Sequence, residues 1–231
     1  MAAHRDANPR RDAHAHVVAL RAGELGHLHP RTASGVFWEF DPLTTGVDET
    51  NPEIDKEAWM VALAYRQDPI GFSIVDGAVD DVGEGSRALA TVLFCPAADA
   101  PGAVRMPTAP VSADAWLVTS LHIDAAVRRR GWESVLLDSV IGAATAAGVA
   151  ALEVFGLRDD IPTEGTSAAC RELAEQAPAI GLTEISILES AGFKVHVDHL
   201  VIPRLRLALP PQFDLLTAHE IAELLAEIPA R

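Results

Sequence analysis

The sequence of 231 residues contains few cysteines, few aromatic residues and few basic residues. Its two cysteines, Cys95 and Cys170, do not make a disulfide framework, and this favours a reducing compartment. No apolar run approaches the roughly 20 residues that a membrane-spanning helix needs, and the polar N-terminus lacks the hydrophobic segment of a secretory signal. We therefore expect a cytoplasmic protein that does not use a membrane as its partner.

Basic residues are outnumbered by acidic ones, with 18 Lys and Arg against 33 Asp and Glu, and the formal net charge is −15. Such a charge argues against nucleic acid or an anionic membrane as the main partner. It is compatible with a cationic amine substrate and equally with solubility alone. Hydrophobic residues make up 49% of the chain, which is ample for a buried core.

The domain organisation is simple. Residues 1–15 are polar and aperiodic, which predicts a disordered tail. We found no internal repeat and no convincing linker beyond them, so residues 16–231 are predicted to form a single domain that ends in an amphipathic helix over 215–228.

A metal site is not expected. Two His-x-His pairs lie near the N-terminus, His14 with His16 and His27 with His29. Alternate residues of an extended chain lie on one side, but further Cys, Asp or Glu ligands at suitable positions are lacking.

The predicted elements alternate between strands and helices, which indicates a mixed α/β protein. The predicted strands cover residues 16–20, 70–75, 87–95, 117–123, 149–156, 193–197 and 200–209. The predicted helices cover residues 22–29, 55–66, 132–147, 166–176, 183–190 and 215–228. Pro178 is expected to follow the end of the fourth helix, and Thr183 to cap the fifth. The proline-rich segment 96–110 is predicted to be a long loop, either a functional lid or disordered.

The segment from 117 to 156 carries the main functional signal. A β-branched strand is followed by Arg128, Arg129, Arg130 and Gly131, and then by apolar residues at helical spacing. A helix N-terminus that follows a glycine turn exposes unpaired backbone N–H groups and the positive end of the helix dipole. The pattern predicts a site for an anion such as pyrophosphate, although three arginines in a turn are often only a solvated face.

Residues 123–131, Ile-Asp-Ala-Ala-Val-Arg-Arg-Arg-Gly, resemble the acetyl-CoA motif of GNAT-type N-acyltransferases, Arg/Gln-x-x-Gly-x-Gly/Ala. Residues 187–194, Ile-Leu-Glu-Ser-Ala-Gly-Phe-Lys, resemble the "LYEKLGF" segment of that family. Three further segments, 106–115, 153–156 and 202–207, are similar to an actinobacterial GNAT group of unassigned substrate. The resemblance extends over roughly residues 16 to 210.

The resemblance implies a twisted mixed sheet of about six to seven strands with helices on both faces. It implies that acetyl-CoA is a co-substrate, held where the fourth and fifth strands diverge, and that an acetyl group is moved directly to a small-molecule or peptide amine. The C-terminal strands and helix would offer a surface for a homodimer. The residues implied in cofactor binding are Leu121, Ile123, Arg128, Arg129, Arg130, Gly131, Trp132, Glu133 and Ser134.

Two residues depart from the family pattern. Glu133 stands where the last glycine of the motif allows close approach of a diphosphate, and it adds a like charge. Leu188 stands where many relatives carry a tyrosine that protonates the leaving thiolate, and leucine has no proton to donate. These departures support a second hypothesis, a catalytically silent GNAT-like protein that binds acyl-CoA or a protein partner as a sensor or scaffold.

Three residues are candidates for chemistry on the acceptor. His122, at the end of the predicted fourth strand, has a side chain suited to general-base work, unless it packs on the far face. Glu153, on the next strand, could act as a base through water. The resemblance places the aromatic cluster 36–40 on the acceptor side, which implies that Glu39 could contact the acceptor amine.

Overall fold

The structure is a computed structural model that describes residues 15–21, 25–41, 51–77, 87–162 and 164–226. Residues 1–14 of the predicted tail and the loop and turn segments at 42–50 and 78–86 lie outside the described residues, whereas Ala15, which was predicted to belong to the tail, is buried at the start of the first strand. No helix in the described ranges combines the length and the hydrophobicity needed to cross a membrane.

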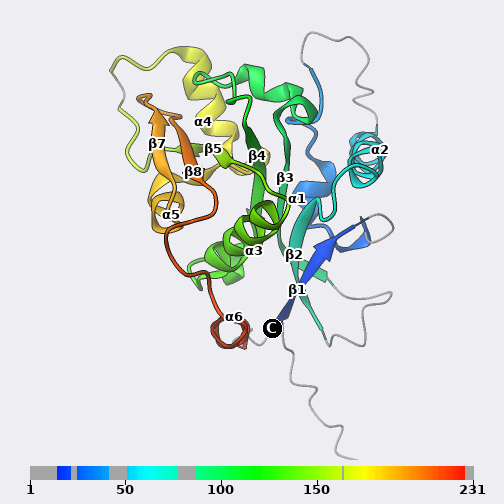
Figure 1. Cartoon of the computed structure of the whole chain (residues 1–231). Coiled ribbons are helices and arrows are strands. Elements are labelled where there is room, and N and C mark those ends of the chain that lie inside the picture. Colours follow the sequence, from blue (N-terminus) through cyan, green and yellow to red (C-terminus); the bar gives the residue numbers. More distant parts are fainter. Residues whose placement is uncertain (1–14, 22–24, 42–50, 78–86, 163, 227–231) are drawn as a thin grey trace, which may run out of the picture.

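The described strands form one sheet in the order β1-β2-β3-β4-β5-β8-β7, with β6 pairing with β5 away from this path (Figure 1). Neighbouring strands are antiparallel, except that β4 pairs in parallel with β5 and β5 with β6. The sheet confirms the predicted mixed α/β class. The strands are β1 (Ala15–Leu20), β2 (Gly71–Asp76), β3 (Arg87–Pro96), β4 (Ala115–Ile123), β5 (Ala151–Leu157), β6 (Thr183–Glu184), β7 (Lys194–Val197) and β8 (Arg204–Ala208).

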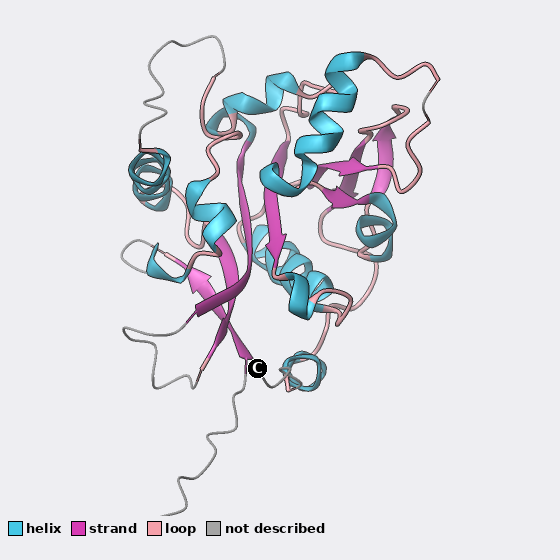
Figure 2. Cartoon of the chain, turned by 180° about the vertical axis from the view of Figure 1, so that it is seen from behind, coloured by secondary structure: helices cyan, strands magenta, loops and turns pink. Residues whose placement is uncertain are grey.

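Helices cover both faces of the sheet. α3 lies in front of the sheet in Figure 1, and α4 crosses its other face in the view from behind in Figure 2. Side chains alternate between the two faces of a strand, so Val118 and Val154 belong to the core beside α3, while Leu117 and Phe155 belong to the opposite core. The helices are α1 (Pro30–Ser34), α2 (Pro52–Ala64), α3 (Trp132–Ala146), α4 (Ala168–Ile180), α5 (Ile185–Ser190) and α6 (Ala218–Leu225).

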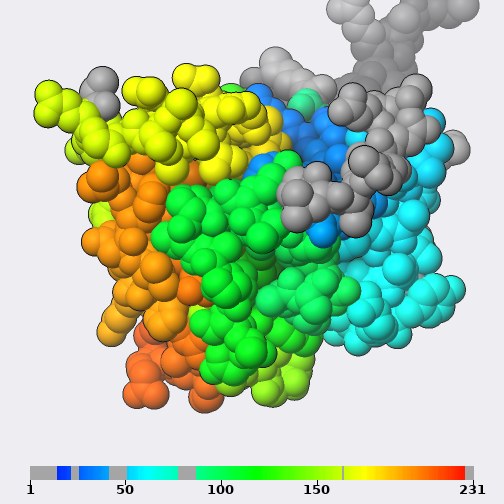
Figure 3. Space-filling view, turned by 90° about the horizontal axis from the view of Figure 1, so that it is seen from above, coloured from blue at the N-terminus to red at the C-terminus, as the bar shows by residue number. Residues whose placement is uncertain are grey.

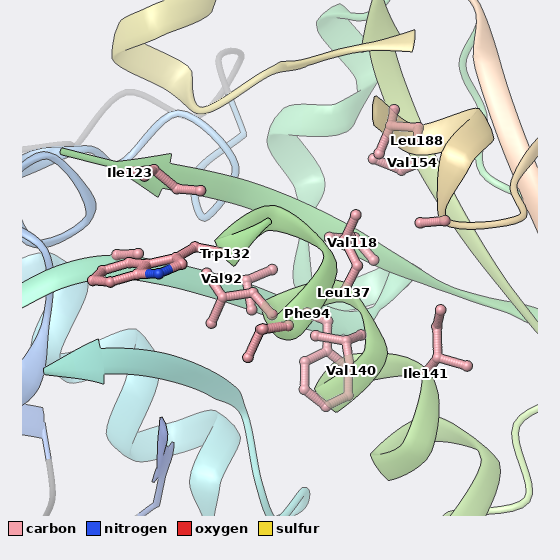
Figure 4. Packing of buried hydrophobic residues seen from close by; sticks show 14 of the residues in the cluster. Val92, Phe94, Val118, Ile123, Trp132, Leu137, Val140, Ile141, Val154 and Leu188 are labelled. Carbon is pink, nitrogen blue, oxygen red and sulfur yellow. The ribbon is translucent and has the colours of Figure 1, made fainter. Parts of the chain in front are cut away.

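The packing of α3 explains why this helix has a fixed position against the sheet. Leu137, Val140 and Ile141 recur at helical spacing and are fully buried against β3 and β4 (Figure 4). Burial of each such side chain stabilises the fold by about 1.5–3 kcal/mol. The N-terminus of α3 is thereby held at the C-terminal end of β4.

Two predicted segments near the N-terminal half are wrong in detail. Instead of a helix over 22–29, the described part has a 3₁₀ turn at Leu25–His27, and α1 begins at Pro30. Proline favours the first helical position, and the His29 side chain accepts a hydrogen bond from the Arg31 N–H. After Pro96, the predicted loop up to residue 110 contains no strand or α-helix, but it is not disordered, because it forms two 3₁₀ turns and buries Ala103 and Met106 in the core.

The segment after β5 also differs from its prediction. α4 continues through Pro178 to Ile180, although proline cannot donate a helical hydrogen bond, and Gly181 then ends the helix in a left-handed conformation. Thr183 does not cap a helix; it lies in β6, which pairs with β5. The last helix starts at Ala218 rather than 215, because Thr217 and Glu220 form a capping box there.

Candidate functional site

The candidate site begins where β4 and β5 diverge. The two strands pair from Ala115 with Ala151 to Val118 with Val154, and no further. Just beyond this point the register between β3 and β4 shifts. Val118 and Leu121 of β4 are three residues apart, whereas their partners in β3, Phe94 and Val92, are two residues apart. A bulge of this kind bends its strand, which turns the C-terminal half of β4 away from β5.

The N-terminus of α3 lies at this divergence. Gly131 is the N-cap residue with a φ of 78°, and no side chain caps the helix. Arg129 is the one non-glycine residue in the described ranges with a positive φ, 62°. This conformation costs energy for a residue with a Cβ atom, and such strain is often found at functional sites. The first N–H groups of α3 have no side-chain cap, which is the arrangement on which the prediction of an anion site depends.

A cavity of about 240 Å³ lies between this turn and the segment that follows α4. Arg31, Arg128 and Arg129 bring positive charge to its wall, and Glu133 and Glu184 bring negative charge. No ion pair or hydrogen bond of the Arg129 side chain is found among the described residues. The lining residues are Arg31, Leu121, His122, Ile123, Arg128, Arg129, Glu133, Leu157, Ala177, Pro178, Gly181, Leu182, Thr183, Glu184 and Ile187.

Trp132 does not face this cavity. Its side chain is fully buried, and its Nε1–H donates to the carbonyl oxygen of Leu224 in α6, at 3.1 Å. A Cβ atom on Gly131 would lie 3.0 Å from the Leu224 side chain. The C-terminal helix α6 therefore packs against the turn through Leu224, a contact that the sequence did not indicate.

His122 lies beside the cavity but is almost completely buried. Its Nε2 is 3.2 Å from the carbonyl oxygen of Ala179, and its Nδ1 is 3.0 Å from the Thr32 hydroxyl. A carbonyl accepts, so Nε2 carries the proton and Nδ1 accepts from Thr32. Burial lowers the pKa of His122 to about 4, and the nearby charges of Lys56 and Arg31 and the stacked His29 ring add to the effect. In this arrangement neither ring nitrogen is free to take a proton from a substrate.

We expect His122 to make the fold less stable in acid. Since its pKa is about 6.5 in the unfolded chain and about 4 in the fold, the unfolded state binds the proton first. The stability that its neutral form provides is complete above pH 6.5 and is lost as the pH falls towards 4, by about 2 kcal/mol between pH 7.5 and pH 5. Urea unfolding at these two pH values checks this.

His122→Gln should flatten the pH dependence, leaving the smaller contribution of His29, whose pKa burial also lowers while Asp124 partly offsets the effect. The exposed His219→Gln is the control and should keep the full dependence. An equal slope in His122→Gln and wild type would contradict the assignment.

Glu153 is held in an internal ion-pair network away from the cavity. Its side chain is fully buried; Oε2 accepts from Arg204 at 2.5 Å and from the Ser112 N–H at 3.1 Å, and Oε1 accepts from Arg206 at 2.9 Å. Burial alone would raise the pKa of Glu153, but the hydrogen bonds from Ser112 and Arg206 and the charge of Arg204 outweigh it and lower the pKa. The carboxylate therefore stays charged, and both of its oxygens accept hydrogen bonds from the chain. It lies on the same face of the sheet as Phe155, opposite α3.

Glu39 is likewise buried and not accessible to a substrate in this arrangement. Its side chain is buried, and its Oε1 accepts from the ammonium of Lys56, a lysine that is itself only 2% exposed. The residue therefore already contacts an amine, one supplied by the chain itself. Its second oxygen, Oε2, has no hydrogen-bond partner among the described residues.

A second hollow, of about 570 Å³, lies beside the Arg158–Asp198 ion pair and His199. The Nε2 of His199 is 3.9 Å from the Sγ of Cys170, a pairing that no spacing in the sequence indicated. The Nδ1 of His199 accepts from two backbone N–H groups. The ring proton is therefore on Nε2, and the imidazole cannot remove the thiol proton.

The described residues also contain no group of three or more His, Cys, Asp or Glu side chains placed for a metal ion.

Fold and site together define a mixed α/β protein in which an arginine-rich turn at a helix N-terminus faces the divergence of two parallel strands. No family model and no curated protein matches the sequence. Among solved structures it is similar to an N-acetyltransferase from Staphylococcus aureus Mu50, with 16% identity, a TM-score of 0.45, and coverage of 84% of this chain and 98% of that one.

Two further solved structures are similar in the same range. The ribosomal-protein-S18-alanine N-acetyltransferase from Escherichia coli shows 14% identity and a TM-score of 0.39, and the comparison covers 88% of this chain and 99% of that one. The GNAT domain of S. lividans PAT shows 16% identity and a TM-score of 0.44, with 84% and 90% covered. At such identities the comparison concerns the fold alone.

Proposed function

We propose that this chain is an N-acyltransferase of the GNAT type that moves an acetyl group from acetyl-CoA to a small-molecule or peptide amine. One observation carries the proposal. The uncapped N-terminus of α3, with Gly131 and Arg129 in left-handed conformations, lies at the divergence of β4 and β5. The end of β4, the arginine-containing turn and the start of α3 therefore lie together. By the resemblance of residues 123–131, these are the elements that would bind the diphosphate of CoA.

The anion end of acetyl-CoA fits these residues. The N–H groups of the first turn of α3 would hold the diphosphate, with Arg128 and Arg129 supplying charge from exposed positions. Glu133 opposes this charge, so the net attraction rests on the arginines. When bound, acetyl-CoA supplies an acyl group that is activated as a thioester.

The rest of acetyl-CoA does not fit the cleft as it stands. A cavity of about 240 Å³ is smaller than the roughly 300–1,000 Å³ of ordinary small-molecule sites. The backbone N–H of Leu121, in the diverging half of β4, already donates to the carbonyl oxygen of Gly181. We therefore assign no catalytic step through the cofactor and no general base in this arrangement.

A second candidate function is a catalytically silent protein of the same fold that binds acyl-CoA or a partner. The arrangement of His122 favours it, since both ring nitrogens are engaged. So does Leu188, which is fully buried in the core and offers no proton donor. Binding of acetyl-CoA without thiol release in the presence of an amine library would select this candidate.

Calorimetric titration with acetyl-CoA tests the anion site. We expect the double variant Arg128→Ala/Arg129→Ala to bind at least about 10-fold more weakly than wild type, because each arginine can make a charge-assisted hydrogen bond to a phosphate. The matched control is Arg21→Ala/Arg66→Ala, which removes two exposed arginines whose ion pairs to Asp68 and Asp99 are remote from α3. Equal affinities of the two double variants would refute the assignment of the diphosphate to this turn.

A further inference from the structure

The chain itself fills the space between the diverging strands. On one side, Thr183 and Glu184 of β6 pair in parallel with Gly156 and Leu157 of β5. On the other side, the N–H of Leu121 in β4 donates to the carbonyl oxygen of Gly181 at 3.0 Å. The segment after α4 thus bridges both strands, and it does so where an acyl-CoA arm would have to enter.

The fit against β4 leaves no room for a ligand. A Cβ atom on Gly181 would lie 2.9 Å from the backbone nitrogen of Leu121 and 2.9 Å from the Cβ of Ser120. Contacts under 3.0 Å are closer than non-bonded carbon atoms tolerate. Glycine is required here both for this approach and for its φ of 75°.

Four consecutive carbonyl oxygens hold the segment in place, and their donors come from the N-terminal region and from β4. Because a helix leaves its last carbonyls without helical partners, the end of α4 can accept these bonds without disturbing its own. Pro178 accepts from Arg31 at 3.2 Å, Ala179 from His122 at 3.2 Å, Ile180 from Trp38 at 2.8 Å and Gly181 from Leu121 at 3.0 Å. Figure 3 shows the yellow region of α4 beside the blue N-terminal region that supplies two of these donors.

The attachment is local. The pairing of β4 with β3 and of β5 with β8 does not involve residues 178–184, so their release would leave the rest of the sheet paired. Release would also remove the carbonyl of Ala179 from the Nε2 of His122 and expose that nitrogen to the cleft. One movement would open the gap and expose the Nε2–H of His122, while Nδ1 would remain bonded to Thr32.

We propose that residues 178–184 are a self-blocking latch, which must leave β4 before an acyl-CoA arm can enter between β4 and β5. The identity of the entering ligand rests on the proposed function. The apparent affinity for acetyl-CoA then equals the intrinsic affinity multiplied by the fraction of molecules with the latch open. A variant that weakens the latch should bind acetyl-CoA more tightly than wild type.

The test uses Trp38→Phe, which removes the Nε1–H that donates to Ile180. The chain offers a matched control in Trp59→Phe, which removes an equivalent bond, also 2.8 Å, from an indole to the carbonyl of Asp99 away from the cleft. We expect Trp38→Phe to bind acetyl-CoA about 3- to 10-fold more tightly than Trp59→Phe, the fold-change that corresponds to one net hydrogen bond.

Gly181→Ala is a second opening variant, because its methyl group would press against β4. Hydrogen–deuterium exchange of the peptide that covers 178–184 gives a readout that is independent of activity. We expect its deuterium uptake to rise when acetyl-CoA binds to wild type, and to be higher in Trp38→Phe than in Trp59→Phe without ligand.

The outcomes separate this inference from the proposed function. If acetyl-CoA binds while uptake over 178–184 stays unchanged and the two tryptophan variants behave alike, the latch is overturned and the proposed function stands. If the latch opens in Trp38→Phe and Gly181→Ala but no protein binds millimolar acetyl-CoA, the latch stands and the proposed function falls. Unchanged uptake together with no binding would overturn both.

Discussion

Glu153→Ala should destabilise the fold by about 3–5 kcal/mol. The carboxylate is fully buried between two arginines, and the Arg204 side chain is only 7% exposed. Removal of Glu153 would leave the Arg204 guanidinium buried without its counter-charge, and the Nε of that arginine already has no hydrogen-bond partner among the described residues. Reversible urea unfolding at pH 7.5 measures the change.

Asp114→Ala is the matched control, since Asp114 also pairs with Arg206 but its side chain is 58% exposed. Exposed ion pairs contribute roughly 0–1 kcal/mol, so this variant should remain close to wild type. The double variant Glu153→Met/Arg204→Met should recover most of the loss, because it removes both buried charges and fills the space. A loss below about 1 kcal/mol in Glu153→Ala would contradict the network as the reason that this glutamate is buried.

The candidate site shows where sequence reasoning succeeds and where it fails. The strand, the glycine turn and the helix from 115 to 146 follow from local periodicity and turn chemistry, and β4, Gly131 and α3 lie as predicted to within two residues. These elements depend on contacts between near neighbours in the sequence.

The roles of single polar residues depend on contacts across the chain, which periodicity does not reveal. His122 is engaged by Thr32 and Ala179, and Glu153 by Arg204, partners that lie 51 or more positions away in the sequence. The same reason explains the prediction of a helix starting at Thr183. Thr183 and Glu184 form a two-residue strand because they pair with Gly156 and Leu157 at the end of β5, a contact that local periodicity does not predict.

Lys56→Met should also destabilise the fold by about 3–5 kcal/mol, because it leaves Glu39 as a buried carboxylate without a cation. The Glu39 side chain has no exposed surface, and its Oε2 already lacks a partner among the described residues. Arg105 also interacts with the charge of Glu39, but its guanidinium donates to the Phe37 carbonyl and lies 3.8 Å from the centre of the Phe37 ring. Urea unfolding again supplies the measurement.

The double variant Glu39→Gln/Lys56→Met should be markedly more stable than Lys56→Met alone, since the penalty comes from the unpaired charge and not from the loss of the ammonium. Arg66→Met, which breaks the exposed pair with Asp99, should cost less than about 1 kcal/mol. If Lys56→Met and Glu39→Gln/Lys56→Met were equally stable, other groups would be stabilising the Glu39 carboxylate, and the prediction would be wrong.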